Sequence, residues 1–397
     1  MSSSTRTVAT LSKGRSGAAL LLCLAALGTT RTAAAEGDEP SPLLSGPEIH
    51  GFVSQGYIRT TENNYLAKSS GRGSFEMAEV GLNFTKQLTD NLRAGVQLFA
   101  RDLGPIGNYD IKADWFYLDY HFADWLGLRA GRTKLPFGLY NEINDVDAAR
   151  VPILLPQGVY PTRNRDFLLS QTGVEIYGRL AAGAIGTLDY RLYGGTIFIE
   201  VPAASAASIE EFGVPYLLGG RLMWETPLEG LRLGASLQKL RLDAKGLVAG
   251  STVEAKAPVV LWLTSIEYAF GDLQLAAEYG RWQGSTTSSD NTAVPPSKTN
   301  RENGYVMAAL RLTEWFEPGA YYSVLFPNTK DRKGPEAQQH DAALTLRFDV
   351  NAHWLFKVEG HYMVGTADLN AGLNDGVQPA KLEDHWGSFL AKTTAYF

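Results

Sequence analysis

Residues 92–101 read LRAGVQLFAR, and this stretch decides the fold. Every second residue is apolar or small: Leu92, Ala94, Val96, Leu98 and Ala100. The residues between them are Arg93, Gly95, Gln97, Phe99 and Arg101. Because successive side chains of a β-strand point to opposite faces, this period of two predicts a strand with an apolar face and a face that carries two arginines.

The same alternation recurs along the chain, for example in residues 231–238 and 342–348. Sixteen such segments of roughly ten residues can be counted, which is typical of membrane β-strands. They centre on residues 52–58, 78–84, 92–100, 115–122, 126–133, 172–178, 188–195, 217–224, 231–237, 262–270, 273–279, 306–312, 316–324, 342–348, 354–362 and 389–397.

The connections between these segments alternate in length. Tight turns such as 123–124 and 271–272 alternate with long connections rich in Gly, Ser, Pro, Asn and Asp, such as 60–74, 200–216, 284–304, 327–340 and 366–385. Short turns at one end and long loops at the other are typical of outer-membrane barrels. The sequence therefore predicts an all-β fold over residues 48–397: a transmembrane antiparallel β-barrel of about sixteen strands. A soluble β-sandwich is excluded because one face of most strands is charged.

Aromatic residues at the strand ends beside short turns predict an interfacial girdle. They are Phe122, Trp125, Phe270, Trp315, Phe316 and Trp354. The chain ends LAKTTAYF, with Phe389 and Phe397 on the same face of an alternating strand. This ending resembles the carboxy-terminal strand of bacterial outer-membrane barrels, which the assembly machinery recognises.

Residues 1–35 have the pattern of a cleaved signal peptide. A basic start precedes the apolar run 18–28, and Ala33 and Ala35 supply small residues before the expected cut. A lipoprotein anchored through Cys23, the only cysteine, is the alternative, although the bulky Leu22 precedes it. A short segment, 36–47, would lead into the barrel. Without the four basic residues of 1–35, the chain has 32 basic and 42 acidic residues and a net charge of −10, which disfavours nucleic acid as a partner.

The third long connection, 134–167, reads KLPFGLYNEINDVDAARVPILLPQGVYPTRNRDF. A connection of this length with four prolines and the apolar residues 153–155 is expected to pack against something, and we expect it to fold into the barrel. Its charges predict a constriction with acids opposite arginines, a transverse field that selects ions. They are Glu142, Asp145, Asp147, Arg150, Arg163 and Arg165. Ordinary solvated loop charges remain the alternative.

The alternation also predicts which charges line the interior, where water can hydrate them. The basic residues are Arg93, Arg101, Arg129, Arg179, Arg191, Arg232, Arg311, Arg347, Lys357 and Lys392. The acids are Glu79, Asp119, Glu175, Asp189, Glu267, Glu278, Glu317 and Glu359. Ten against eight is nearly balanced, so the residues alone indicate a general or weakly selective pore.

Catalytic and metal-binding patterns are absent from the sequence. The six histidines are scattered, and no HExxH, GxSxG or GxGxxG motif occurs in a suitable context. We therefore expect no enzyme activity, no cofactor and no metal.

Two short motifs carry a family resemblance: GRTKLPFG at Gly131–Gly138 and GVEIYG at Gly173–Gly178, together with the terminal Phe397. They resemble the phosphate-selective porins of the O and P type. The resemblance implies a trimeric sixteen-stranded barrel that passes small anions along a ladder of arginines. Arg93, Arg101 and Arg129 fit such a ladder loosely, with acids interspersed.

These observations predict a porin of a Gram-negative outer membrane, with both chain ends in the periplasm. Its partners would be small hydrophilic solutes or ions and outer-membrane lipid, and it would form a homotrimer. A barrel that serves as a surface-binding or adhesion platform, through connections 200–216 and 284–304, is the alternative from another class. A barrel-embedded hydrolase is the third.

Overall fold

The computed structural model describes residues 46–198, 209–248 and 251–397. The predicted signal peptide and residues 36–45 of the expected leading segment lie outside the described residues. Among the described residues, no helix is both long and apolar enough to span a membrane.

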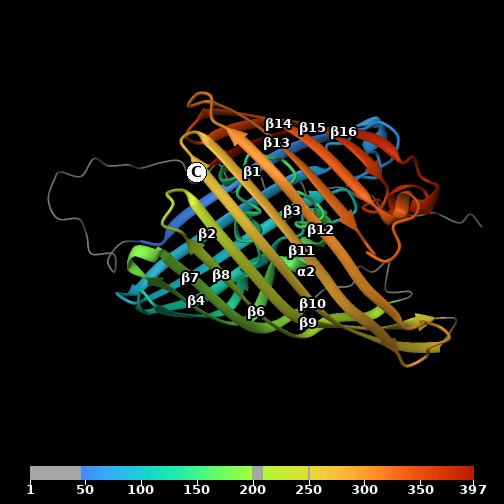
Figure 1. Ribbon diagram of the computed structural model, residues 1–397, viewed down its shortest axis with the longest axis horizontal. Helices are drawn as coiled ribbons and strands as arrows, with labels where there is room; N and C mark the ends of the chain where they lie inside the picture. The colour runs from blue at the N-terminus through green and yellow to red at the C-terminus, as the bar shows by residue number, and fades with distance from the viewer. Residues whose placement is uncertain (1–45, 199–208, 249–250) are drawn as a thin grey trace, which may run out of the picture. The chain divides into compact units, whose positions relative to one another are not determined.

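Sixteen antiparallel strands form a closed barrel in the part of the chain that the structure describes (Figure 1). Each strand pairs with the next in sequence, and β16 pairs with β1. The strands are β1 (Glu48–Thr60), β2 (Met77–Thr89), β3 (Leu92–Leu103), β4 (Lys112–Ala123), β5 (Leu126–Lys134), β6 (Ser170–Ala181), β7 (Thr187–Phe198), β8 (Ile209–Glu225), β9 (Leu231–Val248), β10 (Ser251–Phe270), β11 (Leu273–Ser288), β12 (Ser297–Leu310), β13 (Phe316–Phe326), β14 (Gln339–Asn351), β15 (Trp354–Gly365) and β16 (His385–Tyr396). The predicted fold class and strand count are confirmed.

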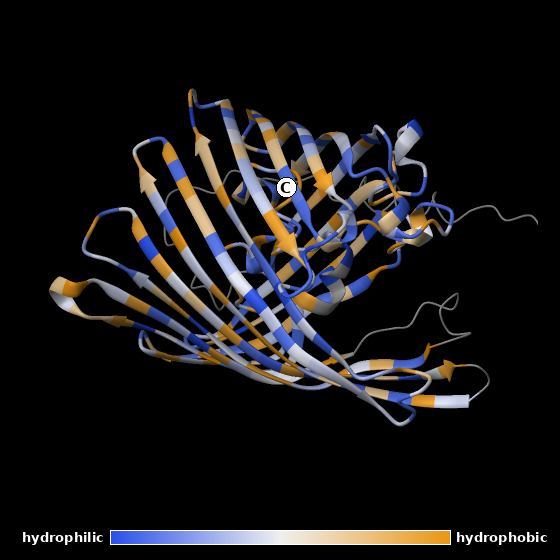
Figure 2. Cartoon of the chain, turned by 45° about the vertical axis from the view of Figure 1, so that its right-hand side comes forward, coloured by the Kyte–Doolittle hydropathy of each residue, from blue (hydrophilic) through white to orange (hydrophobic). Residues whose placement is uncertain are grey.

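The register and the burial of the strands separate an inner from an outer face. In β3 the polar Gln97 is 3% exposed, whereas its neighbour Leu98 is 39% exposed. In β9, Ser236 is buried and Leu237 is 57% exposed. At these positions polar residues point inward and apolar residues outward, the reverse of a soluble protein. Figure 2 shows the resulting alternation of hydrophobic and hydrophilic residues along the strands.

The strands β8 to β11 are longer than the alternation predicted, and in Figure 1 they extend at the lower right beyond their neighbours. The predicted connections 200–216 and 284–304 are wrong in part, because residues 209–216, 284–288 and 297–304 are strand. Beyond Leu237 the outer face of β9 carries Lys239, Arg241, Asp243 and Lys245 in place of leucines. The strand continues there without an apolar outer face, and its apolar residues, Leu240 and Leu242, face inward instead.

The connections differ between the two ends of the barrel. Short turns at one end include residues 90–91, 124–125 and 271–272, whereas connections 61–76 and 366–384 at the other end are long. We call these the turn end and the loop end. The connections contain short helical turns: η1 (Ser70–Arg72), η2 (Asn141–Ile143), η3 (Asp147–Ala149), η4 (Thr162–Asn164), α2 (Arg165–Leu168), η5 (Gly183–Ile185), η6 (Pro335–Ala337), η7 (Ala371–Leu373) and η8 (Pro379–Lys381).

Residues 135–169, between β5 and β6, are called the third loop below. Leu139 N–H donates to Glu278 of β11 at 3.0 Å, and Leu154 N–H donates to Glu359 of β15 at 2.9 Å. Arg101 of β3 donates to the Thr162 carbonyl at 3.0 Å. Since these strands lie far apart around a closed barrel, a loop that contacts all three lies in its interior.

Apolar side chains of the third loop fill part of this interior. Ile153 and Leu154 pack with Ile58, Trp386 and other residues of one cluster. Leu155, Val159 and Tyr160 belong to a second cluster against β10 to β14, and Leu135 to a third against β7 to β10. The loop is therefore a packed element of the barrel core.

Candidate functional site

Strands β14 to β16 hold the middle of the third loop through its backbone. The Lys357 ammonium donates to the carbonyl oxygens of Asp147 at 2.8 Å and Arg150 at 2.6 Å. Arg347 donates to the Ala148 carbonyl at 2.8 Å. Two cations thus face carbonyl groups that a strand or helix would otherwise satisfy. A third, Lys392, pairs with the Asp147 carboxylate at 2.8 Å.

Glu359 on β15 makes the complementary contacts to backbone donors of the loop. Its carboxylate accepts hydrogen bonds from Ile153 N–H at 2.7 Å and Leu154 N–H at 2.9 Å. The same carboxylate is bonded by Thr345 at 2.5 Å and His361 Nε2 at 2.9 Å. A fully buried carboxylate with four partners fixes the loop at this point.

The acids of the third loop pair with nearby cations. Asp145 contacts Arg165 at 2.6 Å and Lys134 at 2.9 Å. Asp147 contacts Arg150 at 2.9 Å. Glu142 contacts Arg221 of β8 at 2.6 Å.

These ion pairs lower the pKa values of two carboxyl groups of the loop. Burial raises the pKa of Asp145, but Arg165 and Lys134 outweigh burial and hold that pKa well below the ordinary value. For Asp147, Lys392 and Arg150 likewise overcome burial and lower the pKa. The two carboxyls therefore stay ionised in the loop.

The predicted transverse field is not what the structure shows. Arg150 and Arg165 are 7% and 6% exposed and pair with Asp147 and Asp145 of the same loop, so these charges do not face each other across open space. Burying either partner alone would cost several kcal/mol, which favours direct pairing. Arg163 lies apart from these pairs, and its Nε has no hydrogen-bond partner among the described residues.

A strip of alternating charge runs over the inner face from β4 to β8, where charged side chains stay partly exposed. Arg129 contacts Asp119 at 2.8 Å and Glu175 at 3.3 Å. Arg191 contacts Glu175 at 2.6 Å and, more loosely, Glu142 at 3.7 Å. Arg221 completes the strip through Glu142. The strip therefore connects the inner face of β4 to β8 with the first helical turn of the third loop, η2.

The other residues predicted to line the interior all lie on the inner face, at different depths. Arg93, Arg179, Arg232 and Arg311 have side chains 36–54% exposed and lie near the turn end. Asp189 pairs with Arg179 at 3.9 Å, Glu317 pairs with Arg311, and Glu79 pairs with Lys392 at 2.6 Å. The remaining residues are buried on the inner face: Arg101, Arg347, Lys357, Lys392, Glu175, Glu267, Glu278 and Glu359.

A lining role in open water is wrong for Lys357, Glu175 and Glu359, because all three are 0% exposed. Lys357 lies beneath the third loop and donates to its carbonyls, and Glu175 lies behind two arginines. The alternation predicts the face of a strand, but it does not predict what covers that face.

Sequence reasoning missed several residues of this site. Arg221 alternates with Leu218, Leu222 and Trp224 in β8, so the period of two could have identified it. Asp114, which accepts two hydrogen bonds of 2.8 Å from Arg165, is the residue left unpaired at an irregularity in the pairing of β3 with β4 and had no such signal.

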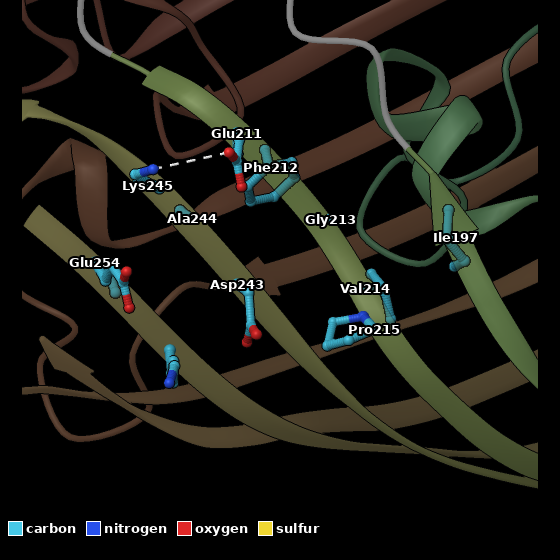
Figure 3. A pocket seen from close by; sticks show the side chains of 12 residues that line it. Ile197, Glu211, Phe212, Gly213, Val214, Pro215, Asp243, Ala244, Lys245 and Glu254 are labelled. Atoms are coloured by element: carbon cyan, nitrogen blue, oxygen red, sulfur yellow. Dashed lines mark ion pairs between the residues drawn. The ribbon is translucent and has the colours of Figure 1, made fainter.

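A separate hollow of about 410 Å³ lies among β7 to β10 at the loop end. Figure 3 shows the side chains that line it. Glu211, Asp243, Lys245 and Glu254 are among its lining residues, and Lys245 pairs with Glu211 at 3.8 Å. Among the described residues no group of three or more His, Cys, Asp or Glu side chains could hold a metal ion.

No protein-family model matches the sequence, and no curated protein sequence matches it. Solved structures match over nearly the whole barrel. OmpT of Vibrio cholerae superposes with a TM-score of 0.58 at 13% identity, covering 88% of this chain and 97% of OmpT. The chain has the fold of outer-membrane barrels. The anion-selective porin from Comamonas acidovorans gives a TM-score of 0.54 at 12% identity, covering 89% of this chain and 99% of the porin.

A third barrel with this fold is OmpF of Salmonella typhi, solved in complex with daunomycin. It gives a TM-score of 0.54 at 14% identity and covers 88% of this chain and 97% of OmpF. At such low identities the likeness establishes the barrel architecture, and the phosphate-selective family that the short motifs resemble is not among these three structures.

Proposed function

We propose that this chain is an outer-membrane porin whose interior is a water-filled channel for passive diffusion of small hydrophilic solutes and ions. The observation that carries the proposal is the combination of an apolar outer face with a charged interior that the third loop crosses. A closed barrel satisfies its backbone groups within lipid, and sixteen strands enclose more space than side chains fill.

The proposed passage runs along the strip from β4 to β8. The side chains of Arg129, Arg191 and Glu142 are 19–25% exposed there, whereas the wall of β14 to β16 is covered by the loop. The loop charges Glu142, Asp145, Asp147, Arg150, Arg163 and Arg165 would act mainly by fixing the loop, and Glu142 alone of the three acids would face solutes at this strip.

We include a preference for anions in the proposal. In two arginine–acid pairs near the turn end the arginine is much the more exposed partner, whereas in the Arg221–Glu142 pair the acid is, at 25% against 14%. The side chain of Arg232 is 46% exposed and that of Glu267 is 8% exposed; for Arg311 and Glu317 the fractions are 36% and 9%. At these two pairs a passing ion would meet the guanidinium group first, although the formal charges nearly balance. The Comamonas neighbour is named an anion-selective porin.

Further parts of the proposal concern the setting of the protein. The outer face would contact outer-membrane lipid, the chain ends and the turn end would face the periplasm, and residues 1–35 would be a removed signal peptide. A homotrimer is supported by a trimer form of the Vibrio OmpT barrel. The neighbours with functional names are porins or channels, which supports a diffusion role over an enzyme and does not favour the surface platform.

Liposome swelling tests the proposal. Vesicles that contain the refolded chain should swell in neutral sugars at rates that fall steeply with sugar size, and small anions should enter faster than cations of equal size. Vesicles with folded protein that do not swell in any of these solutes contradict the channel. Equal rates for anions and cations contradict only the charge preference.

A further inference from the structure

Tyr177 of β6 lies flat across the inner surface of β5. Its cross-strand neighbour on β5 is Gly127, and its hydroxyl donates to Asp119 of β4 at 2.6 Å. A side chain that starts on β6 and ends on β4 has to cross the strand between them. The ring therefore covers Gly127.

Only glycine leaves room for this ring. A Cβ at position 127 would lie 2.1 Å from the nearest ring carbon of Tyr177, whereas ordinary contact begins at 3.4 Å. The rest of the strand cannot move away, because β5 is hydrogen-bonded on both sides. Any larger residue at 127 would therefore lift the ring toward the centre of the barrel.

The same arrangement occurs a second time, on the neighbouring strand and in the opposite direction. Tyr193 of β7 lies across Gly219 of β8 and reaches Gln238 of β9, with 3.2 Å between hydroxyl and amide oxygen. A Cβ at 219 would lie 2.5 Å from the Tyr193 ring. Tyr193 is buried beside Leu135 at the start of the third loop, whereas Tyr177 faces the partly exposed strip.

Two guanidinium groups of that strip also pack against the ring of Tyr177. The guanidinium carbons of Arg129 and Arg191 lie 5.2 and 5.3 Å from its ring centroid, within the range of cation–π contacts. The height of the ring above the wall therefore sets how far both guanidiniums reach into the interior.

We infer that Gly127 and Tyr177 form a joint that sets the width of the passage along β4 to β8 and positions Arg129 and Arg191 toward passing anions. The inference rests on the proposed diffusion function. Gly127 contacts no solute and acts through the ring, so it is a positioning residue. Its role is specific to the lumen, because the ring and both arginines lie on the inner face.

The test is single-channel recording of the refolded full chain and of Gly127→Ala in potassium chloride. The methyl group should push the ring inward by at least about 1 Å, and we expect conductance to fall on the order of 1.5-fold because the passage narrows. The reversal potential in a salt gradient should shift as well, because both guanidiniums move. A merely structural glycine would leave the reversal potential unchanged.

Gly360→Ala is the matched control, because Gly360 is exposed on the outer face of β15 with nothing within 4 Å of an added Cβ. It should conduct like the wild type. In the Gly127→Ala background, Tyr177→Ala should bring conductance back to the wild-type value or above.

The outcomes separate the two proposals. A folded wild type without channels refutes the diffusion function. A conducting wild type with a Gly127→Ala variant of the same conductance and reversal potential overturns the joint. If Gly127→Ala does not fold, Tyr177→Ala alone decides: a wider channel is expected, and wild-type conductance and selectivity overturn the inference.

Discussion

Replacing Glu359 by glutamine should release the third loop from the wall. In the native protein one oxygen of the Glu359 carboxylate accepts from Leu154 N–H and His361, and the other from Ile153 N–H and Thr345. Glutamine offers one oxygen and an amide group that cannot accept. At least one buried backbone N–H of the loop then loses its partner.

The magnitude follows from that count. A buried donor without a partner costs about 1–3 kcal/mol, so the population with a detached loop should rise about 5- to 150-fold. The barrel itself should persist, because its strand ladder does not depend on this carboxylate.

Cysteine labelling measures this population. The only cysteine is Cys23, within the predicted signal peptide, so a refolded chain without residues 1–35 allows a single reporter at Leu154→Cys. Leu154 is 2% exposed, and its thiol should react only when the loop detaches. Glu359→Gln should accelerate labelling by about the factor given above. Glu314→Gln, in an exposed turn, is the control with an unchanged rate. Equal labelling rates in the Glu359→Gln and control proteins would refute the anchoring role of Glu359.

Three further outcomes are expected. The pKa values of Asp145 and Asp147 are depressed, so their ion pairs contribute stability above the ordinary aspartate pKa of 3.8 and lose it only as the pH falls through the lower folded pKa values. The labelling rate of Leu154→Cys, corrected with an exposed cysteine, should therefore stay constant from pH 8 to pH 4. A rise in the labelling rate centred near pH 6 contradicts this. Arg165→Met removes the guanidinium that pairs with both Asp114 and Asp145 and leaves Lys134 as the cation beside Asp145. It should lower the free energy of unfolding in detergent by about 3–5 kcal/mol, so an unchanged unfolding midpoint argues against the pairing. Arg232→Gln should move the reversal potential toward cations, whereas Lys239→Gln on the outer face should not; equal potentials would count against guanidinium-based selectivity.

The sequence predicted the barrel because lipid and water impose a period of two on every strand that crosses between them. The prediction missed the loop-end parts of β9 and β10, where the outer face carries Asp243 and Lys245 and no longer signals lipid. It also missed the pairing inside the third loop. Asp145 meets Arg165 twenty positions away, and no local pattern links the two residues.

The depth of each inner residue was equally hidden from the sequence. Lys357 and Arg232 both lie on the inner face of their strands and carry the same charge, yet Lys357 is buried beneath the loop while the side chain of Arg232 is 46% exposed. The course of the third loop decides between these two environments, and that course depends on contacts with strands more than two hundred residues away, such as Glu359 with Ile153.

The most direct test of the central claim is single-channel recording of the refolded chain in a planar bilayer under a tenfold salt gradient. The account predicts discrete current steps and a reversal potential displaced toward the anion equilibrium potential. Steps with a reversal potential displaced toward cations would contradict the guanidinium-lined passage. Silence from protein shown to be folded would contradict the channel itself.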